Sequence, residues 1–172
     1  MTIYALSSGS GVSGIAVVRV SGKEAADVLK QLTGDKLPTP KMATLKKVKN
    51  INTNELIDEA IIIWFPGPDS YTGEDLVEFH VHGSRAVIDQ LHTTISKIKN
   101  YRLAEPGEFT RLAFQNGKIN LLKAESIADL IAAETEIKRK KAIKIMTGKS
   151  TVKVKSWRKK HIKSLKQKEA KQ

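Results

Sequence analysis

Three side chains that can hydrogen-bond or exchange protons stand at alternate positions near the middle of the chain. In the run LVEFHVH, Glu78, His80 and His82 alternate with apolar residues, and this period of two predicts a β-strand over residues 76–82. One carboxylate and two imidazoles would then share a face, where we expect His82 to line a pocket or support its turn. A solvated polar face is the alternative interpretation. Two histidines at this spacing could also bind a metal, but no third ligand is evident.

The segment before this strand is predicted to be a rigid loop. A buried strand ends at Phe65, and residues 66–68 (Pro-Gly-Pro) exclude a helix because proline fixes φ and biases the preceding residue toward extended geometry. Asp69, Ser70 and Gly73 add residues typical of turns. A rigid loop beside a polar strand face could hold a ligand at little cost in chain entropy.

Arg19 is an isolated charge within residues 15–20 (IAVVRV), a predicted strand that is apolar on both faces. A charge in such a position needs a partner. One interpretation is a structural ion pair, with Glu78 as the obvious candidate. The other interpretation is that Arg19 binds an anionic ligand, and the residues alone leave both open.

A glycine-rich segment precedes that strand. Gly9, Gly11 and Gly14 have the spacing G-x-G-x-x-G, but the dinucleotide-binding fingerprint also requires a helix to begin at the third glycine. The β-branched residues 15–20 follow instead, as is typical of a strand. We therefore predict a glycine loop that joins two strands, over residues 3–6 and 15–20.

The rest of the pattern predicts further strands and several helices. Strands are expected over residues 44–49, 56–65 and 101–103. Four helices are expected: one that opens with a capping box from Ser21 to Glu24 and ends at Gly34, one capped by Ser84, one through Phe114, and one long helix that begins at Asn120. Lys118 falls at the junction between loop and helix, just before the last of these.

Charge is distributed unevenly along the 172 residues. Residues 1–136 hold 15 basic and 17 acidic side chains, whereas residues 137–172 hold 15 basic side chains and a single acid, Glu169. Such a tail would attract phosphate backbones in a salt-dependent way, although a solvated helix face is an equal alternative. The chain has no cysteine, which excludes disulfides and zinc–thiolate sites. No apolar run approaches the roughly 20 residues of a membrane span.

Several motifs together carry a resemblance to a known family. FPGPDSYTGEDLVEFHVHG, AEPGEFT, AFQNGKINLLKAESIADLI and the start ALSSGSGVSGIAVVRVSG resemble the N-terminal region of the tRNA modification GTPases of the MnmE (TrmE) family. The resemblance covers about residues 2–166. It implies an α+β fold with a mixed sheet and helices packed on it, similar to the tetrahydrofolate-binding domain of aminomethyltransferases, followed by a basic helical segment.

The resemblance also implies a function. Residues 1–119 would be a folate-binding and dimerisation domain, and residues 120–172 the start of a central helical domain. The cofactor would be 5-formyltetrahydrofolate or another one-carbon tetrahydrofolate, and Arg19, Glu78 and Lys118 match the family's folate contacts. The homodimer would act in the cytoplasm with an FAD-dependent partner of the MnmG (GidA) family, on carbon 5 of the wobble uridine of tRNA.

Some positions depart from the family pattern. Leu112 stands where the family usually has arginine, and Arg111 is one place away. Asn120 replaces an aspartate and Ser84 a glycine. The sequence has no Walker A loop in its proper context, no guanine-specificity motif and no C-terminal cysteine motif. We therefore expect that this chain alone does not hydrolyse GTP.

Two other functions fit the same residues. The chain could be an RNA-associating or assembly module in which the basic tail carries the function. It could also be a free-standing folate-dependent one-carbon transferase, although Glu78 is the only convincing acid–base group for such a reaction.

Overall fold

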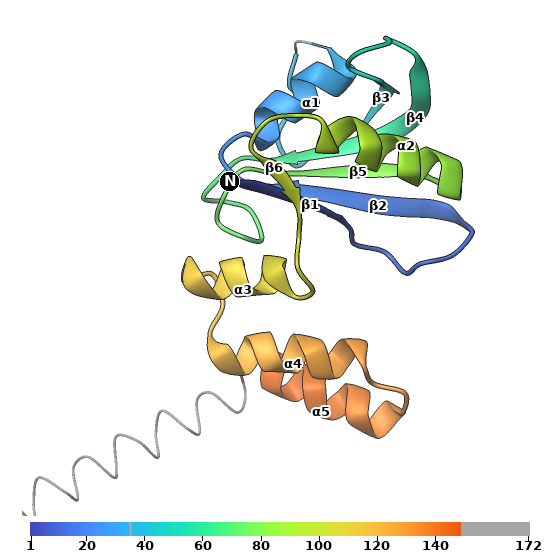
Figure 1. The fold of residues 1–172 in the computed structure, drawn as a ribbon. Helices are drawn as coiled ribbons and strands as arrows, with labels where there is room; N and C mark the ends of the chain where they lie inside the picture. The colour runs from blue at the N-terminus through green and yellow to red at the C-terminus, as the bar shows by residue number, and fades with distance from the viewer. Residues whose placement is uncertain (35, 149–172) are drawn as a thin grey trace, which may run out of the picture. The chain divides into compact units, whose positions relative to one another are not determined.

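The computed structural model describes residues 1–34 and 36–148. The chain forms two compact units, Met1–Lys118 and a second that begins at Ile119. The elements are β1 (Thr2–Leu6), β2 (Ser13–Ser21), α1 (Ala25–Thr33), β3 (Thr44–Lys49), β4 (Leu56–Phe65), β5 (Leu76–Gly83), α2 (Arg85–Ser96), β6 (Tyr101–Leu103), α3 (Glu108–Gln115), α4 (Leu121–Ile131) and α5 (Glu136–Met146) (Figure 1).

The first unit is built on a six-stranded mixed sheet with the order β3-β4-β5-β2-β1-β6. β6 pairs parallel to β1, and the other neighbouring strands pair antiparallel. β1 and β2 form the antiparallel pair on either side of the glycine loop, which confirms that this loop joins two strands and does not open a helix. The α+β class with a mixed sheet is confirmed.

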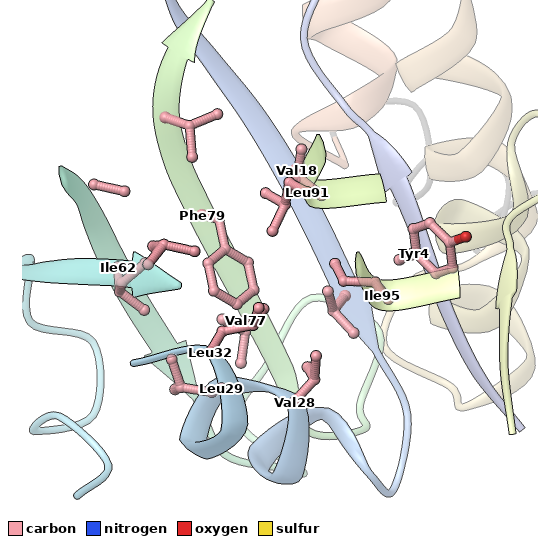
Figure 2. Packing of buried hydrophobic residues seen from close by; sticks show 14 of the residues in the cluster. Tyr4, Val18, Val28, Leu29, Leu32, Ile62, Val77, Phe79, Leu91 and Ile95 are labelled. Carbon is pink, nitrogen blue, oxygen red and sulfur yellow. The ribbon is translucent and has the colours of Figure 1, made fainter. Parts of the chain in front are cut away.

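The core lies on one face of the sheet, beneath α1 and α2 (Figure 1). Val18, Val20 and Phe79 on the central strands are fully buried there. Figure 2 shows Phe79 facing side chains of α1, with Leu91 and Ile95 of α2 between Phe79 and Tyr4. Burying this many apolar side chains supplies the main driving force for folding. It also fixes the register of the strands, because a slip by one residue would turn Val18 and Phe79 away from the helices.

The opposite face of the sheet carries the polar residues of the central strands, and we call it the open face. Arg19 lies directly across from Glu78 in the β2–β5 register, and Ile63 of β4 follows in the same row. In the next row Ile61 lies across from both His80 and Leu45. The alternation predicted for residues 76–82 is thereby confirmed.

Two local predictions about helices are wrong. The first is the capping box: Glu24 precedes α1 without a side-chain cap, and the hydroxyl of Ser21 is 2.7 Å from that of Thr72. Ser21 is the last residue of β2 and is fully buried, so its hydroxyl is satisfied by the distant loop and not by the adjacent helix. The end of α1 at Gly34 is confirmed.

The second wrong prediction is a single long helix from Asn120. Asn120 does cap α4, since its Oδ1 accepts a hydrogen bond from the backbone of Lys123 at 2.9 Å. However, α4 ends at Ile131, and α5 begins after Thr135, which caps it through the amide of Lys138. The predicted basic segment beyond residue 148 lies outside the described residues. None of the helices that the structure describes combines the length and the apolar character needed to cross a membrane.

Candidate functional site

An ion pair between neighbouring strands lies at the centre of the open face. The Nε and Nη2 atoms of Arg19 both donate to Oε1 of Glu78, at 3.1 and 2.7 Å. The two side chains retain 26% and 16% of their exposure, so solvent or a ligand can reach them. The sequence offered this pairing as one of two interpretations of Arg19, and the pairing is found.

Two aromatic rings flank the guanidinium of Arg19. Its central carbon lies 5.6 Å from the ring centre of Tyr71 and 5.4 Å from that of Phe109, within the range of cation–π attraction. Tyr71 belongs to the loop after β4, whereas Phe109 belongs to the first turn of α3. The two elements also meet where the hydroxyls of Tyr71 and Thr110 lie 3.0 Å apart.

The loop between β4 and β5 holds its shape through its own hydrogen bonds. The amide of Gly67 donates to Oδ1 of Asp75 at 2.8 Å, and the amide of Gly73 donates to the hydroxyl of Ser70 at 3.0 Å. The Ser70 hydroxyl donates in turn to the carbonyl of Glu74. Thr72 is fully buried and paired with Ser21 of β2. These hydrogen bonds restrain the loop in one conformation, which holds Tyr71 beside Arg19.

Lys118, which follows α3, contacts the same loop. Its Nζ donates to the carbonyl of Pro68 at 2.7 Å, and Nδ2 of Asn116 donates to the carbonyl of Thr72 at 2.7 Å. Gly73 has φ +82°, and a Cβ there would lie only 3.1 Å from Asn116 and 3.2 Å from Lys118. Only glycine permits this approach without a shift. Lys118 thus contacts the loop that carries Tyr71, while Arg19 and Glu78 contact each other.

The two histidines of β5 have different surroundings. Nε2 of His80 is 3.1 Å from Oε2 of Glu78, and the His80 side chain is 28% exposed. His82 is 72% exposed and bonds to Asp58 of β4, through Nδ1 at 2.8 Å and through its backbone amide at 2.8 Å. His80 therefore belongs to the Arg19–Glu78 cluster, and His82 does not. Within residues 1–34 and 36–148, no three His, Asp or Glu side chains lie together in a way that could hold a metal ion.

The hydrogen-bonding capacity of Glu78 is not exhausted by these contacts. An ionised carboxylate offers about four acceptor positions. Contacts within the described residues use two positions on Oε1 and one on Oε2, which leaves one on Oε2. A partly exposed carboxylate with a free acceptor position, next to two aromatic faces, can bind a planar ligand that presents N–H donors.

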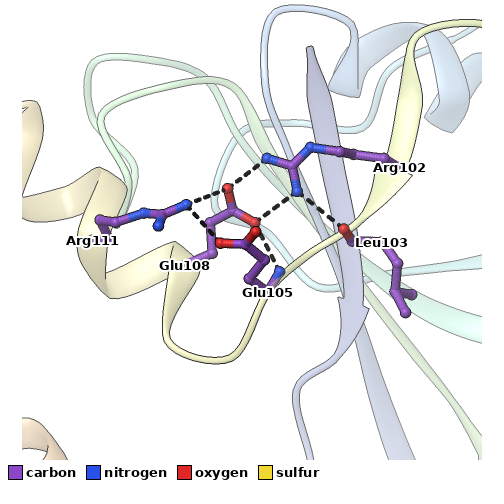
Figure 3. Close-up of polar contacts among 5 residues, drawn as sticks. All are labelled: Arg102, Leu103, Glu105, Glu108 and Arg111. Carbon is purple, nitrogen blue, oxygen red and sulfur yellow. Dashed lines mark hydrogen bonds and ion pairs between the residues drawn. The ribbon is translucent and has the colours of Figure 1, made fainter.

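A second charged cluster joins β6 to the start of α3 (Figure 3). Arg102 donates to both oxygens of Glu108, at 2.6 and 2.9 Å, and Arg111 donates to Oε1 of Glu108 at 2.9 Å. Glu108 also accepts a hydrogen bond from the amide of Glu105 at 2.8 Å. These contacts, with the Arg102 hydrogen bond as the largest cause, lower the pKa of Glu108 to about 2. The cluster fixes the start of α3, on which Phe109 stands.

Sequence reasoning missed the aromatic partners of Arg19 and the role of this second cluster. Arg19 stood out because a charge is unexpected in a strand that is apolar on both faces, and Glu78 because it shares a polar strand face with two histidines. Tyr71 and Phe109 gave no comparable signal, since nothing local predicts that a loop and a distant helix meet over one guanidinium. Arg111, noted only as one place from the usual family arginine, pairs with Glu105 and Glu108. The assignment of Arg19, Glu78 and Lys118 to a ligand stays a prediction.

Comparison with known proteins identifies the family. The family model described as the N-terminus of the GTP-binding protein TrmE matches residues 2–118. The chain belongs to the TrmE family. This match coincides with the unit that carries the sheet and the Arg19–Glu78 pair, and the chain corresponds to the N-terminal part of the tRNA modification GTPases of this family.

Curated TrmE relatives include both bacterial and mitochondrial proteins. The chain is 69% identical over 171 residues to the tRNA modification GTPase MnmE of Pelagibacter ubique. This alignment covers 99% of this chain and 39% of the Pelagibacter protein. It is 46% identical over 156 residues to MnmE of Agrobacterium fabrum, covering 91% of this chain and 35% of the relative. The mitochondrial 5-taurinomethyluridine-[tRNA] synthase subunit GTPB3 of Danio rerio is 48% identical over 147 residues, 86% of this chain and 29% of that protein. The chain therefore spans less than two fifths of the length of these relatives.

Proposed function

We propose that residues 1–119 bind a one-carbon tetrahydrofolate, such as 5-formyltetrahydrofolate, on the open face of the sheet. The observation that supports this most strongly is the accessible Arg19–Glu78 pair between two aromatic rings. The aminopyrimidinone edge of a pterin presents adjacent N–H donors, and a carboxylate can accept such donors in pairs. Glu78 is therefore the proposed recognition group for the ring.

The residues fit such a ligand if Arg19 gives up part of its present pairing. Two ligand donors need two acceptor positions on Glu78, and one is open beside the three now in use. Arg19 donates twice to the same oxygen, so releasing one of these bonds frees the second position. Arg19 and Lys118 are proposed to bind polar ring atoms or the carboxylates of the ligand. When bound, the folate supplies the one-carbon unit, while these side chains supply orientation and charge.

We also propose that a second copy of the chain covers part of the open face. Leu45 and Ile61 lie across from each other there, 68% and 44% exposed, and Ile15 of β2 is 65% exposed. Exposed apolar side chains on one sheet favour burial against a partner. Replacing Ile61 with glutamate should then convert a dimer into a monomer in sedimentation equilibrium, and an unchanged dimer would contradict this surface.

The chain is further proposed to act as the N-terminal part of a tRNA-modifying GTPase in the cytoplasm. Residues 120–172 would be the start of its central helical domain. The names of the relatives support tRNA as the substrate, with carboxymethylaminomethyl modification of the wobble uridine as the proposed reaction and an FAD-dependent MnmG-family protein as the partner. Binding and hydrolysis of GTP are proposed for the part of the relatives that this chain does not cover.

Calorimetric titration with 5-formyltetrahydrofolate tests the folate proposal. The 172-residue protein should bind it, and Arg19→Ala, Glu78→Ala and Lys118→Ala should each weaken binding. His82→Ala is the matched control, because His82 lies on the same strand as Glu78 but bonds to Asp58. A folded parent protein that does not bind the folate would refute the proposal.

RNA association is a second candidate, favoured by the charge of α5. Lys138, Lys141 and Lys144 recur at intervals of three along this helix, while Glu136 is paired with Arg139 and Lys140. Binding of tRNA whose affinity falls steeply with salt, and is lost when residues 137–172 are removed, would support it. Folate binding that persists in the shortened protein would assign the two activities to different units.

A further inference from the structure

His80 is the only other side chain of β5 that bonds to Glu78 in the described part of the chain. Its Nε2 lies 3.1 Å from Oε2 of Glu78, whereas both contacts of Arg19 go to Oε1. An ionised carboxylate can only accept hydrogen bonds, so the proton of this contact resides on Nε2 of His80. The carboxylate is thereby held at both oxygens, by side chains from two adjacent strands.

The contact from His80 has a different effect on the carboxylate from that of Arg19. Donors that meet at one oxygen hold that oxygen, but the carboxylate can still tilt about it when the rest of the Glu78 side chain moves. A donor at the second oxygen removes this freedom. Recognition of two adjacent N–H donors depends on the plane of the carboxylate, because both bonds are strong only when the ligand edge and the carboxylate are nearly coplanar.

We propose that His80 is a positioning residue that sets the plane of the Glu78 carboxylate for a ligand with paired N–H donors. The proposal rests on the proposed function, since it concerns how Glu78 recognises the folate ring. His80 acts through Glu78. Truncating it therefore lowers the affinity most for ligands that use both oxygens.

His82 provides a matched control within the same strand. It lies two residues farther along and bonds to Asp58, not to Glu78. Its side chain is 72% exposed, against 28% for His80. The same substitution at His80 and at His82 therefore separates a loss of the Glu78 contact from a general loss of an imidazole on β5.

The experiment compares H80L, H80Q and H82L with the parent protein by calorimetric titration of 5-formyltetrahydrofolate. H80L should bind roughly 10-fold more weakly, because a misaligned carboxylate weakens its paired hydrogen bonds with the ligand by about the strength of one such bond. H80Q should recover most of this affinity, because a glutamine amide can donate to Oε2, and H82L should bind as the parent does. Urea unfolding of each variant verifies that the protein is folded.

A second titration uses a 2-desamino-2-methyl analogue of the same folate, which lacks one of the paired donors. H80L should narrow the affinity ratio between the two ligands, because the lost contact matters only for the paired donors. A purely structural role would lower both affinities equally, and that result would overturn the proposal. Parent-like binding by H80L, or equal losses in H80L and H80Q, would also overturn it. If the folded parent binds no folate, the proposed function fails and this inference fails with it.

Discussion

Two arginine–carboxylate clusters in the first unit contain the same residue types but differ in how completely their carboxylates are used. Glu108 accepts four hydrogen bonds, from Arg102, Arg111 and the amide of Glu105. Its side chain is 4% exposed. Glu78 accepts three and is 16% exposed. The first carboxylate is saturated, and the second retains one acceptor position.

This difference indicates what each cluster can do. A saturated, buried carboxylate contributes to stability, because removing any partner leaves a charge without compensation. A partly exposed carboxylate with a free acceptor contributes less to stability and more to binding. The first cluster thus fixes the start of α3, on which Phe109 stands, and the second is the one that we propose binds the ligand.

The largest effect is expected from Glu108→Gln. The substituted amide would carry no charge to balance the two arginines, and we expect the free energy of unfolding to fall by about 3 kcal/mol. Urea denaturation followed by circular dichroism measures this change. A loss as small as that of a surface pair would mean that the cluster is not a structural element.

Protonation of Glu108 at low pH should lower the free energy of unfolding by nearly as much as Glu108→Gln does. The pKa of Glu108 is lowered to about 2 from an ordinary 4.5, so its ionised form stabilises the folded state above pH 4.5. This stabilisation, up to about 3 kcal/mol, is lost as the pH falls from 4.5 toward 2. The free energy of unfolding of the parent protein and that of Glu108→Gln should therefore converge as the pH approaches the low end of this range. Parallel curves for the two proteins would contradict the assignment.

Glu78→Gln should affect ligand binding more than stability, in contrast to the effect expected for Glu108→Gln. We expect folate affinity to fall roughly 30-fold, or about 2 kcal/mol, because an amide cannot accept both donors. The free energy of unfolding should change by less than about 1 kcal/mol, since the pair is partly exposed. Titration and urea denaturation on the same sample give both numbers. A large loss of stability with unchanged binding would make Glu78 a second structural carboxylate.

Gly73→Ala tests whether the loop places Lys118. The new methyl group would press on Asn116 and Lys118, so folate affinity should fall several-fold in addition to a loss of about 1 kcal/mol in stability from the positive φ. Gly34→Ala is the control, because Gly34 also has positive φ but has open space around it. Equal affinities for the two variants would exclude a role for this contact.

His82→Ala should have the smallest effect. The His82 imidazole is 72% exposed, and Asp58 keeps its hydrogen bonds from the amides of Glu59 and His82, so loss of the imidazole is expected to cost about 0.5 kcal/mol or less in stability. Folate affinity should not change. An affinity loss comparable to that of Glu78→Gln would extend the site along β5 and remove the distinction between His80 and His82.

The strand over residues 76–82 could be predicted because apolar residues alternate with polar ones, and the strand over residues 15–20 because it is rich in β-branched residues. The pairing of Arg19 with Glu78 could be anticipated because Arg19 is a charge within an apolar strand and needs a partner. The capping box at Ser21 could not be judged locally, because the competing partner, Thr72, is 51 positions away. The break between α4 and α5 was also missed. Residues 132–135 have good helix formers, but Thr135 caps a new helix and Ala142 is buried in the unit.

The most direct test is an NMR titration of the 172-residue protein with 5-formyltetrahydrofolate that follows the side-chain N–H resonances of the arginines. The ligand should shift the resonances of Arg19, whose bonds to Glu78 are rearranged, and leave those of Arg102 in place. Shifts at Arg102 in place of Arg19, or no shift at Arg19 in a folded protein with saturating ligand, would contradict the assignment of the ligand to Glu78.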